Sequence, residues 1–121
     1  MNGARQYRRG AAFELRVRDK LKDHGYFAAR TPGSKTPVDV TGVRADGVLF
    51  IQCKRNGKLA ARDWNELVRL AASVNATPIL ASIPESGRGI ALYRLTGEKP
   101  ARSRTQPREP FTLAAEEART A

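Results

Sequence analysis

Apolar residues recur at every third or fourth position in two parts of the chain, and this spacing predicts two helices. The first stripe, within residues 11–24, consists of Phe13, Val17 and Leu21. The second stripe, within residues 59–74, consists of Trp64, Leu67, Val68 and Ala71. Each helix therefore has one apolar face, which must be buried against another layer of the domain.

Short apolar runs between and after these segments predict five strands. Residues 38–43 and 48–54 are expected to pair as a hairpin around a turn at Asp46 and Gly47. Residues 48–51 are apolar on both faces, which is typical of a central strand covered on both sides. The other strands are expected at residues 26–30, 77–83 and 90–95. This order predicts a mixed α/β domain with a five-stranded sheet flanked by helices.

The two ends of the chain lack such patterns. Residues 1–10 are basic and poor in apolar residues, so we expect a flexible N-terminal arm. Residues 97–121 are rich in Pro, Arg, Glu and Thr, which predicts a poorly ordered tail. The folded domain is therefore expected to span residues 11–96.

Charge narrows the class of partner. The chain has 22 Lys and Arg against 12 Asp and Glu, a net charge of +10. Such an excess predicts binding to a polyanion, with nucleic acid as the first candidate. A membrane surface fits less well, because no cationic helix carries bulky apolar residues on its opposite face. Solubility alone is the alternative explanation.

Cysteine content and hydropathy indicate the compartment. A single cysteine excludes an intrachain disulfide and a Cys-rich zinc site, and is consistent with a reducing environment. No apolar run is long enough for a signal peptide or a membrane span. We therefore expect a cytoplasmic protein of a prokaryotic cell or of a phage-infected host.

Polar residues on the predicted core strands suggest a catalytic site. Gln52 and Lys54 are two positions apart on one strand and so share a face, and Asp39 lies on the neighbouring strand. Glu14 lies at the edge of the first apolar stripe and can reach toward the sheet. Two carboxylates, an amide and an ammonium group are thus expected to converge. Oxygen ligands of this kind suit Mg²⁺, for which Mn²⁺ can substitute, and such an ion can promote phosphodiester hydrolysis.

The motifs around these residues resemble those of the archaeal-type Holliday junction resolvases, in the PD-(D/E)xK nuclease superfamily. They are G-x-x-F-E, which ends at Glu14, then R-T-P-G-S-x-x-P-V-D-V, which includes Asp39, and F-I-Q-C-K, which ends at Lys54. The resemblance covers roughly residues 8–95 and implies a restriction-endonuclease-like core, Mg²⁺-dependent cutting of four-way DNA junctions, and a homodimer.

Carried over residue by residue, the resemblance assigns roles to five positions. Glu14 and Asp39 match the acidic metal ligands, and Lys54 matches the catalytic lysine. Ser34 matches a loop serine close to the reacting phosphate, and Gln52 stands where the family usually has glutamate. The expected catalytic set is therefore Glu14, Ser34, Asp39, Gln52 and Lys54, and the expected metal ligands are Glu14, Asp39 and Gln52.

Gln52 leaves other functions open. An amide oxygen can bind Mg²⁺ but brings no negative charge, so metal affinity or metal preference can differ from the usual pattern. One alternative is a related nuclease that cuts forks or duplex DNA. Another is a DNA-binding module with an attenuated site, in which Gln52 only hydrogen-bonds to backbone.

Basic residues around the proposed site are candidates for DNA contacts. In the arm these are Arg5, Arg8 and Arg9, and near the site they are Arg30, Lys35, Arg55 and Lys58. Phosphate contacts from Lys and Arg supply most sequence-independent affinity for DNA. The alternative for every one of these residues is an ordinary solvated surface.

Overall fold

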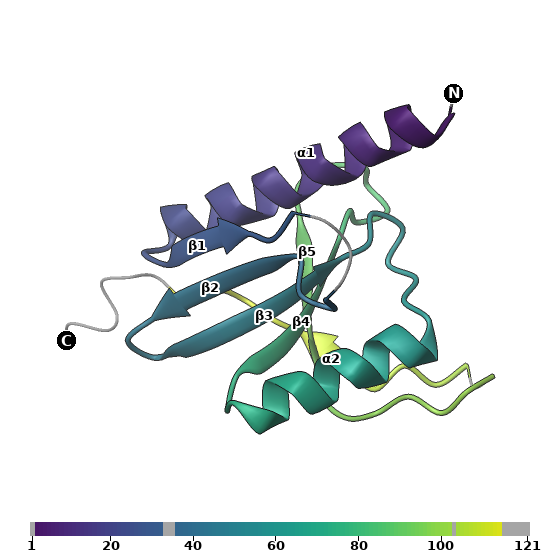
Figure 1. The fold of residues 1–121 in the computed structure, drawn as a ribbon. Helices are drawn as coiled ribbons and strands as arrows, with labels where there is room; N and C mark the ends of the chain where they lie inside the picture. The colour runs from purple at the N-terminus through teal and green to yellow at the C-terminus, as the bar shows by residue number, and fades with distance from the viewer. Residues whose placement is uncertain (1, 33–35, 103, 115–121) are drawn as a thin grey trace.

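The computed structural model describes residues 2–32, 36–102 and 104–114, with side chains from residue 8 onward. Within these residues two helices and six strands follow one another along the chain (Figure 1). They are α1 (Asn2–Asp23), β1 (Phe27–Arg30), β2 (Val40–Arg44), β3 (Gly47–Cys53), α2 (Ala61–Ser73), β4 (Thr77–Ser82), β5 (Ala91–Leu95) and β6 (Arg108–Pro110). The helices lie on opposite sides of the sheet, which confirms the mixed α/β architecture.

The strands form one sheet in the order β1-β2-β3-β4-β5-β6. Only β3 and β4 are parallel, and α2 makes the crossover between them; all other neighbours are antiparallel. The expected number of five strands was wrong, because β6 adds a sixth strand next to β5. This strand is three residues long and has no apolar run, so the hydrophobic pattern did not indicate it.

Helix α1 begins earlier than its apolar stripe. Residues 2–10, expected as a flexible arm, continue the helix up to Asn2, and no proline interrupts them. The stripe of Phe13, Val17 and Leu21 is almost completely buried against the sheet. The helix ends where Gly25 adopts a φ of 84° and the Tyr26 amide donates to the Leu21 carbonyl. No helix in the described part of the chain is long and apolar enough to cross a membrane.

The face of the sheet under α1 is closed by residues from both ends of the chain. Val40 of β2 and Ile51 of β3 are fully buried there. Phe111 and Leu113, from the expected tail, pack on the same cluster. The segment up to residue 114 is therefore part of the folded domain, and residues 115–121 of the predicted tail lie outside the described residues.

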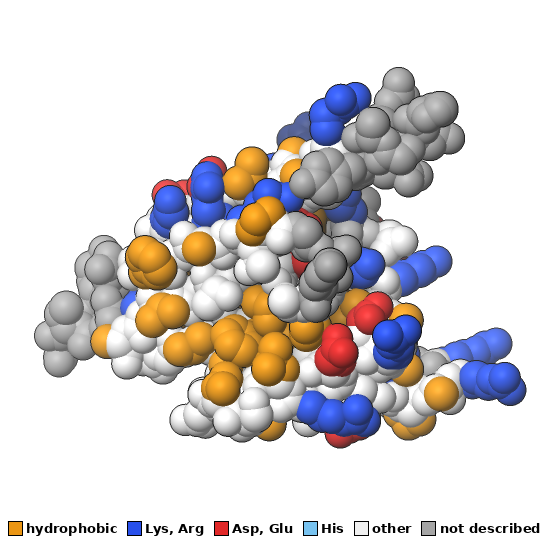
Figure 2. Space-filling model, viewed as in Figure 1, with side chains coloured by type: hydrophobic (Ala, Val, Ile, Leu, Met, Phe, Trp, Pro, Cys, Tyr) orange, Lys and Arg blue, Asp and Glu red, His pale blue; other side chains and the backbone are white. Residues whose placement is uncertain are grey.

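The face under α2 is only partly covered. Trp64 and Leu67 of α2 are fully buried against Leu80 of β4, so Trp64 belongs to the core. Phe27 of β1 and Val43 of β2 are cross-strand neighbours that remain 76% and 41% exposed. Figure 2 shows hydrophobic side chains gathered over this part of the sheet and beside α2. This apolar face, defined by Phe27 and Val43, has no covering element within the described chain.

Candidate active site

Asp39 lies between the ends of β1 and β3 and is held on both sides. Its amide donates to the Ile51 carbonyl at 2.8 Å, and its carbonyl accepts from the Thr31 amide at 2.8 Å. Because Val40 also pairs with Ile51, two residues oppose one, which is the arrangement of a β-bulge. The bulge turns the Asp39 side chain out of the regular alternation, and its Oδ2 accepts the Cys53 amide at 2.8 Å.

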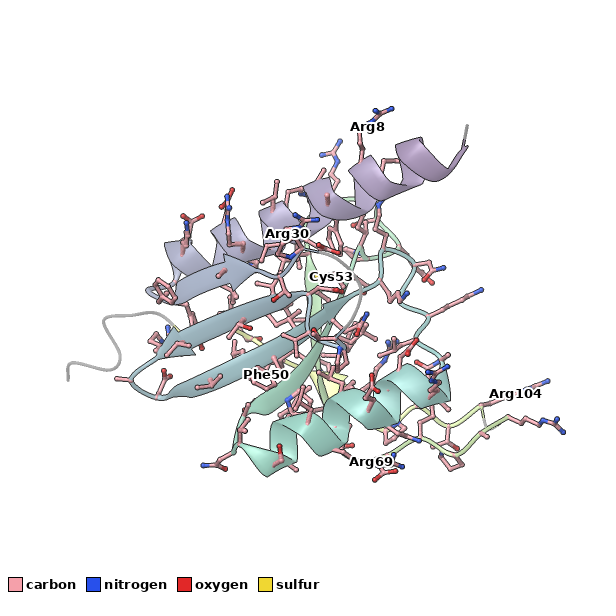
Figure 3. All side chains as sticks on the ribbon, viewed as in Figure 1. Arg8, Arg30, Phe50, Cys53, Arg69 and Arg104 are labelled. Carbon is pink, nitrogen blue, oxygen red and sulfur yellow. The ribbon has the colours of Figure 1, made fainter. Side chains whose placement is uncertain are left out.

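Glu14 of α1 and Arg30 of β1 form an ion pair beside this strand end. Arg30 Nε donates to Glu14 Oε1 at 2.7 Å, and the two side chains are only 19% and 18% exposed. Figure 3 shows Arg30 and Cys53 in the space between α1 and the hairpin of β2 and β3. Arg30 was expected to contact DNA phosphates. In the structure its guanidinium instead forms an ion pair with Glu14, a candidate metal ligand.

Electrostatics connect these groups. The pKa of Asp39 is raised from 3.8 to about 6, chiefly by burial and also by the negative charge of Glu14. The Cys53 amide, Lys54 and Arg30 act in the opposite direction and lower this pKa. Each group must lie within electrostatic reach of Asp39 to exert this effect. The structure therefore places Asp39 within electrostatic reach of both Glu14 and Lys54, and the catalytic roles of the three residues stay predictions.

The Cys53 side chain packs against the core under α1, and its thiol is not reactive. Burial, together with the charges of Asp39 and Glu14, raises the pKa of its thiol. A thiol that stays protonated is a poor nucleophile. Its backbone amide is the functional group here, because it orients Asp39. Every non-proline residue has such an amide, so no residue type in the sequence could have indicated this contact.

Gln52 and Lys54 follow from the geometry of β3. Gln52 pairs with Leu80 in the parallel ladder and so lies on the α2 face of the sheet. Its Oε1 is buried and has no hydrogen-bond partner within the described chain. Nor does any hydrogen bond between described residues join Gln52 to Asp39 or Glu14, so its role as a ligand stays a prediction. Lys54 follows the last residue of β3, and its amide donates a hydrogen bond to the Ala81 carbonyl at 2.9 Å.

An open hollow of about 540 Å³ lies beside Lys54. It is lined by Arg9, Gly10, Cys53, Lys54, Arg55 and Asn56. Arg55 is fixed to the neighbouring strand, since its carbonyl accepts the Ile83 amide at 3.0 Å. The hollow thus joins the N-terminal half of α1 to the end of β3, and its two arginines are exposed. Asn56 was not predicted at this position, and a lone loop asparagine offers no distinctive signal.

The remaining predicted residues differ in how far they can be placed. Arg8 on α1 and Lys58 after β3 are exposed. Ser34 and Lys35 lie outside the described residues, as does the side chain of Arg5. Their proposed roles therefore remain predictions.

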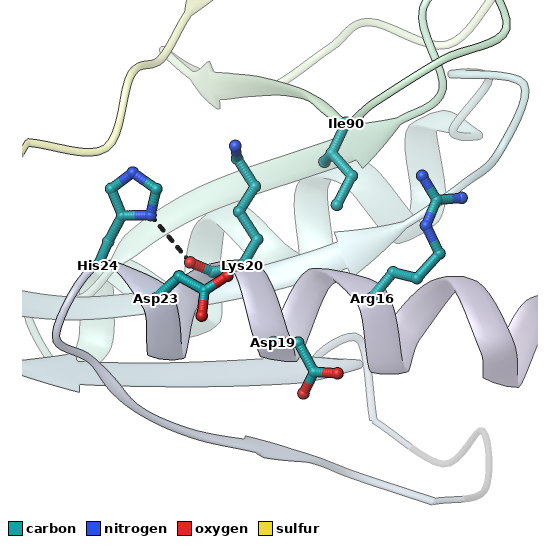
Figure 4. Close-up of a pocket in the computed structure, with 6 residues that line it drawn as sticks. All are labelled: Arg16, Asp19, Lys20, Asp23, His24 and Ile90. Atoms are coloured by element: carbon teal, nitrogen blue, oxygen red, sulfur yellow. Dashed lines mark hydrogen bonds between the residues drawn. The ribbon is translucent and has the colours of Figure 1, made fainter.

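A second hollow, of about 340 Å³, lies against the other side of α1 (Figure 4). It is lined by Arg16, Asp19, Lys20, Asp23, His24 and Ile90. The His24 ring makes a hydrogen bond through Nδ1 to the Lys20 carbonyl at 2.9 Å, so it serves the end of the helix. The opposite charges in this hollow largely cancel, and it contains none of the predicted catalytic residues.

The donor set near Lys54 fits a hard divalent cation. Asp39 and Glu14 supply carboxylate oxygens in a poorly hydrated place. The Gln52 Oε1, which has no hydrogen-bond partner among the described residues, lies on the α2 face, so its part in such a donor set stays a prediction. No three His, Cys, Asp or Glu side chains gather in a metal-binding group among the described residues. A metal here would therefore need a ligand outside these four residue types, such as Gln52 or water.

Two comparisons with known proteins bear on the family and the fold of the chain. The model of a family described as archaeal Holliday junction resolvase (Hjc) matches residues 5–86. The solved structure of Hjc from Archaeoglobus fulgidus, a Holliday junction resolvase from an archaeal hyperthermophile, is similar with a TM-score of 0.63. The two sequences are 21% identical, and the match covers 86% of this chain and 90% of that chain. No curated protein sequence matches.

These findings carry different weight. At 21% identity, the structural likeness shows a shared fold only. The family match spans more than half of the chain and includes Glu14, Asp39 and Lys54. The chain therefore belongs to the archaeal Holliday junction resolvase family, which is a family of nucleases that act on branched DNA.

Proposed function

We propose that this protein is a metal-dependent endonuclease that resolves four-way DNA junctions by paired nicks. The observation that supports this most is the half-buried Asp39, which lies within electrostatic reach of the half-buried Glu14 and of Lys54. The basic hollow beside Lys54 offers a place for the phosphate backbone. Since the substrate is DNA, we further propose that it acts in the cytoplasm of a prokaryotic cell or of a phage-infected host.

The chain's own residues prepare the site for hydrolysis. Mg²⁺, or Mn²⁺ in its place, would be held by Asp39, Glu14 and Gln52, and would polarise the scissile phosphate and activate a water molecule. The Cys53 amide holds the Asp39 carboxylate in one orientation. Lys54 can orient the attacking water or neutralise the charge that develops on the phosphate. Arg30 neutralises Glu14 and keeps it beside Asp39.

Paired nicks require two sites in one particle, which a two-fold dimer provides. The apolar face of Phe27 and Val43 is the surface that we propose for the contact between two copies. An exposed Phe beside an exposed Val on a sheet face is unfavourable in water and is relieved by burial. The resemblance to homodimeric resolvases favours a second copy of this chain as the covering partner.

The dimer proposal is tested with Phe27→Asp and, as a control, Leu15→Asp on exposed α1, where the wild-type leucine is 38% exposed. Sedimentation velocity should show a dimer for the wild type and the control, and a monomer for Phe27→Asp. On a supercoiled plasmid with an extruded cruciform, paired nicks give linear product, whereas the monomeric variant should give only nicked circles. A dimeric Phe27→Asp protein would show that the interface lies elsewhere.

The proposed function is tested by incubating the protein with a mobile four-way junction, a fork and a linear duplex, each with Mg²⁺ or Mn²⁺. Symmetric paired nicks confined to the junction are the expected result. Comparable cutting of forks or duplex would instead identify a nuclease of broader or different substrate range. Tight junction binding without cutting in either metal would indicate a DNA-binding module.

A further inference from the structure

The segment between β5 and β6, described at residues 96–102 and 104–107, is attached to α2 at its base. Trp64 Nε1 donates to the Gly97 carbonyl at 2.9 Å. Asn65 holds Lys99 from both sides, donating to its carbonyl at 3.0 Å and accepting its amide at 2.7 Å. These contacts connect residues more than 30 positions apart, so the base of the loop has a defined place on the domain.

Charged side chains strengthen the same attachment. Arg69 of α2 donates two hydrogen bonds to the Glu98 carboxylate, at 2.8 and 3.2 Å. Lys99 Nζ donates to the Leu59 carbonyl at 3.1 Å and lies 5.2 Å from the centre of the Trp64 ring. Because Glu98 is engaged by Arg69, the acid of the loop does not offset the positive charge farther along it.

The outer part of the loop is basic, and its described arginines are exposed. Residues 99–107 contain Lys99, Arg102 and Arg104 and no acidic residue. Arg102 and Arg104 are exposed, and Figure 3 shows Arg104 pointing away from the body of the protein. Neither arginine forms an ion pair with a described residue. A φ of 62° at Arg102 marks a turn that favours Gly or Asn, yet an arginine stands there.

Two hollows connect this loop to the candidate active site. The hollow beside Lys54 is lined by α1 and by residues 53–56. A third hollow, of about 490 Å³, is lined by Lys58, Leu59, Ala60, Lys99 and Gln106. Both hollows are lined in part by residues of the connection between β3 and α2, and none of their lining residues is acidic. A basic edge, consisting of Arg9, Lys54, Arg55, Lys58, Lys99, Arg102 and Arg104, therefore runs from α1 to the loop.

We propose that the loop of residues 96–107 contacts the phosphate backbone of a duplex arm of the branched substrate, through Arg102 and Arg104. This rests on the proposed function, and it adds a contact from a segment outside the family match, which ends at residue 86. Duplex DNA carries one charge per about 1.7 Å of its axis, so it suits cations spread over three separate elements better than a small anion does.

The test compares two variants that each remove two positive charges. Arg102→Gly with Arg104→Ala is the loop variant, with glycine chosen to suit the turn at residue 102. Arg18→Ala with Lys22→Ala, on the C-terminal half of α1, is the control. The loop variant should bind a four-way junction about tenfold more weakly, and the control should bind as the wild type does.

Salt dependence and turnover give the second readout. For each loop in contact with DNA, the slope of log affinity against log salt should become shallower by about two in the loop variant. Cleavage at saturating junction should stay unchanged, because the loop contains none of the catalytic residues. Asn65→Ala, which loosens the base but keeps every charge, should weaken binding a few-fold without changing the slope. Thermal unfolding of each variant verifies that it folds. If the double loop variant does not fold, the single variant Arg104→Ala takes its place.

The outcomes separate the two proposals. If the wild type binds and cuts junctions but the loop variant binds as the control does, the loop proposal is overturned and the proposed function stands. If the wild type neither binds nor cuts junctions, both are overturned. Weaker binding in both double variants to the same degree would show only an effect of net charge, and would also overturn the loop proposal.

Discussion

The acidic site and the basic edge beside it are built in opposite ways. Glu14 and Asp39 are half-buried, and each is held by a specific partner, Arg30 or the Cys53 amide. The cations of the edge are mostly exposed and come from α1, the connection after β3 and the loop before β6. The acids can thus be placed accurately for chemistry, whereas the edge can follow a long polyanion without fixing any single contact.

This difference teaches how mutations should act. A group held in a poorly hydrated site has a large effect on the reaction, because few alternatives can replace it. An exposed cation contributes one of many phosphate contacts, so its loss weakens binding modestly and in a salt-dependent way. Variants of the site should therefore change cleavage, and variants of the edge should change affinity.

Lys54 provides the most severe test of this division, since it belongs to both regions. Lys54→Ala should reduce single-turnover cleavage by about 10²–10⁴-fold, because the group that orients or deprotonates the water is lost. Junction affinity should change only a few-fold. The matched control is Lys58→Ala, an exposed lysine on the same connection, which should leave cleavage at saturating DNA unaltered. Equal behaviour of the two variants would mean that Lys54 is merely part of the edge.

Asp39→Asn should reduce the rate of single-turnover cleavage by about 10²–10³-fold, because the amide brings no charge to the metal. It also tests the raised pKa. Since the pKa of Asp39 is about 6 in the folded protein and 3.8 without the fold, its contribution to stability is greatest at low pH and is lost as the pH rises through about 6. In metal-free protein, the free energy of unfolding should therefore fall between about pH 4 and 6 more steeply for the wild type than for the variant.

Denaturant titrations in EDTA across this pH range measure the difference. Adding Mg²⁺ above pH 6 should restabilise the wild type and leave Asp39→Asn nearly unaffected. Identical pH profiles for both proteins would indicate that Asp39 is well hydrated, and would remove the contrast between a buried site and an exposed edge.

Arg9 and Arg55 test the edge at the hollow beside Lys54. The double variant Arg9→Ala with Arg55→Ala should weaken junction binding about tenfold, with a salt slope shallower by about two per site. Cleavage at saturating DNA should remain within a few-fold of the wild type. A large loss of turnover at saturation would show that one of these arginines acts on the reacting phosphate, so that the edge and the site are not separate.

The sequence predicted the parts of this picture that depend on periodicity and motif spacing. The helical stripe of Phe13, Val17 and Leu21 and the hairpin that carries Asp39 have strong local patterns. It missed β6 and the attached loop, because those rest on contacts such as Trp64 to Gly97, which connect distant positions and follow no local pattern. The bulge at Asp39 and the pairing of Arg30 with Glu14 likewise depend on tertiary placement.

Gln52 gives the last test, because its variants should change the metal requirement and leave junction binding intact, and they show where the acidic site ends. If its buried Oε1 is a metal ligand, Gln52→Glu should lower the Mg²⁺ concentration needed for half-maximal cleavage by about tenfold, since a charged oxygen replaces a neutral one. Gln52→Leu, of similar size, should raise that concentration by a similar factor while leaving junction binding intact. The leucine should not reduce stability, because the oxygen it removes has no partner among the described residues. If Gln52→Leu instead cleaves with an unchanged Mg²⁺ requirement, the placement of Gln52 on the α2 face keeps it out of the metal site. The site would then consist of Glu14, Asp39 and Lys54, with water completing the coordination of the ion.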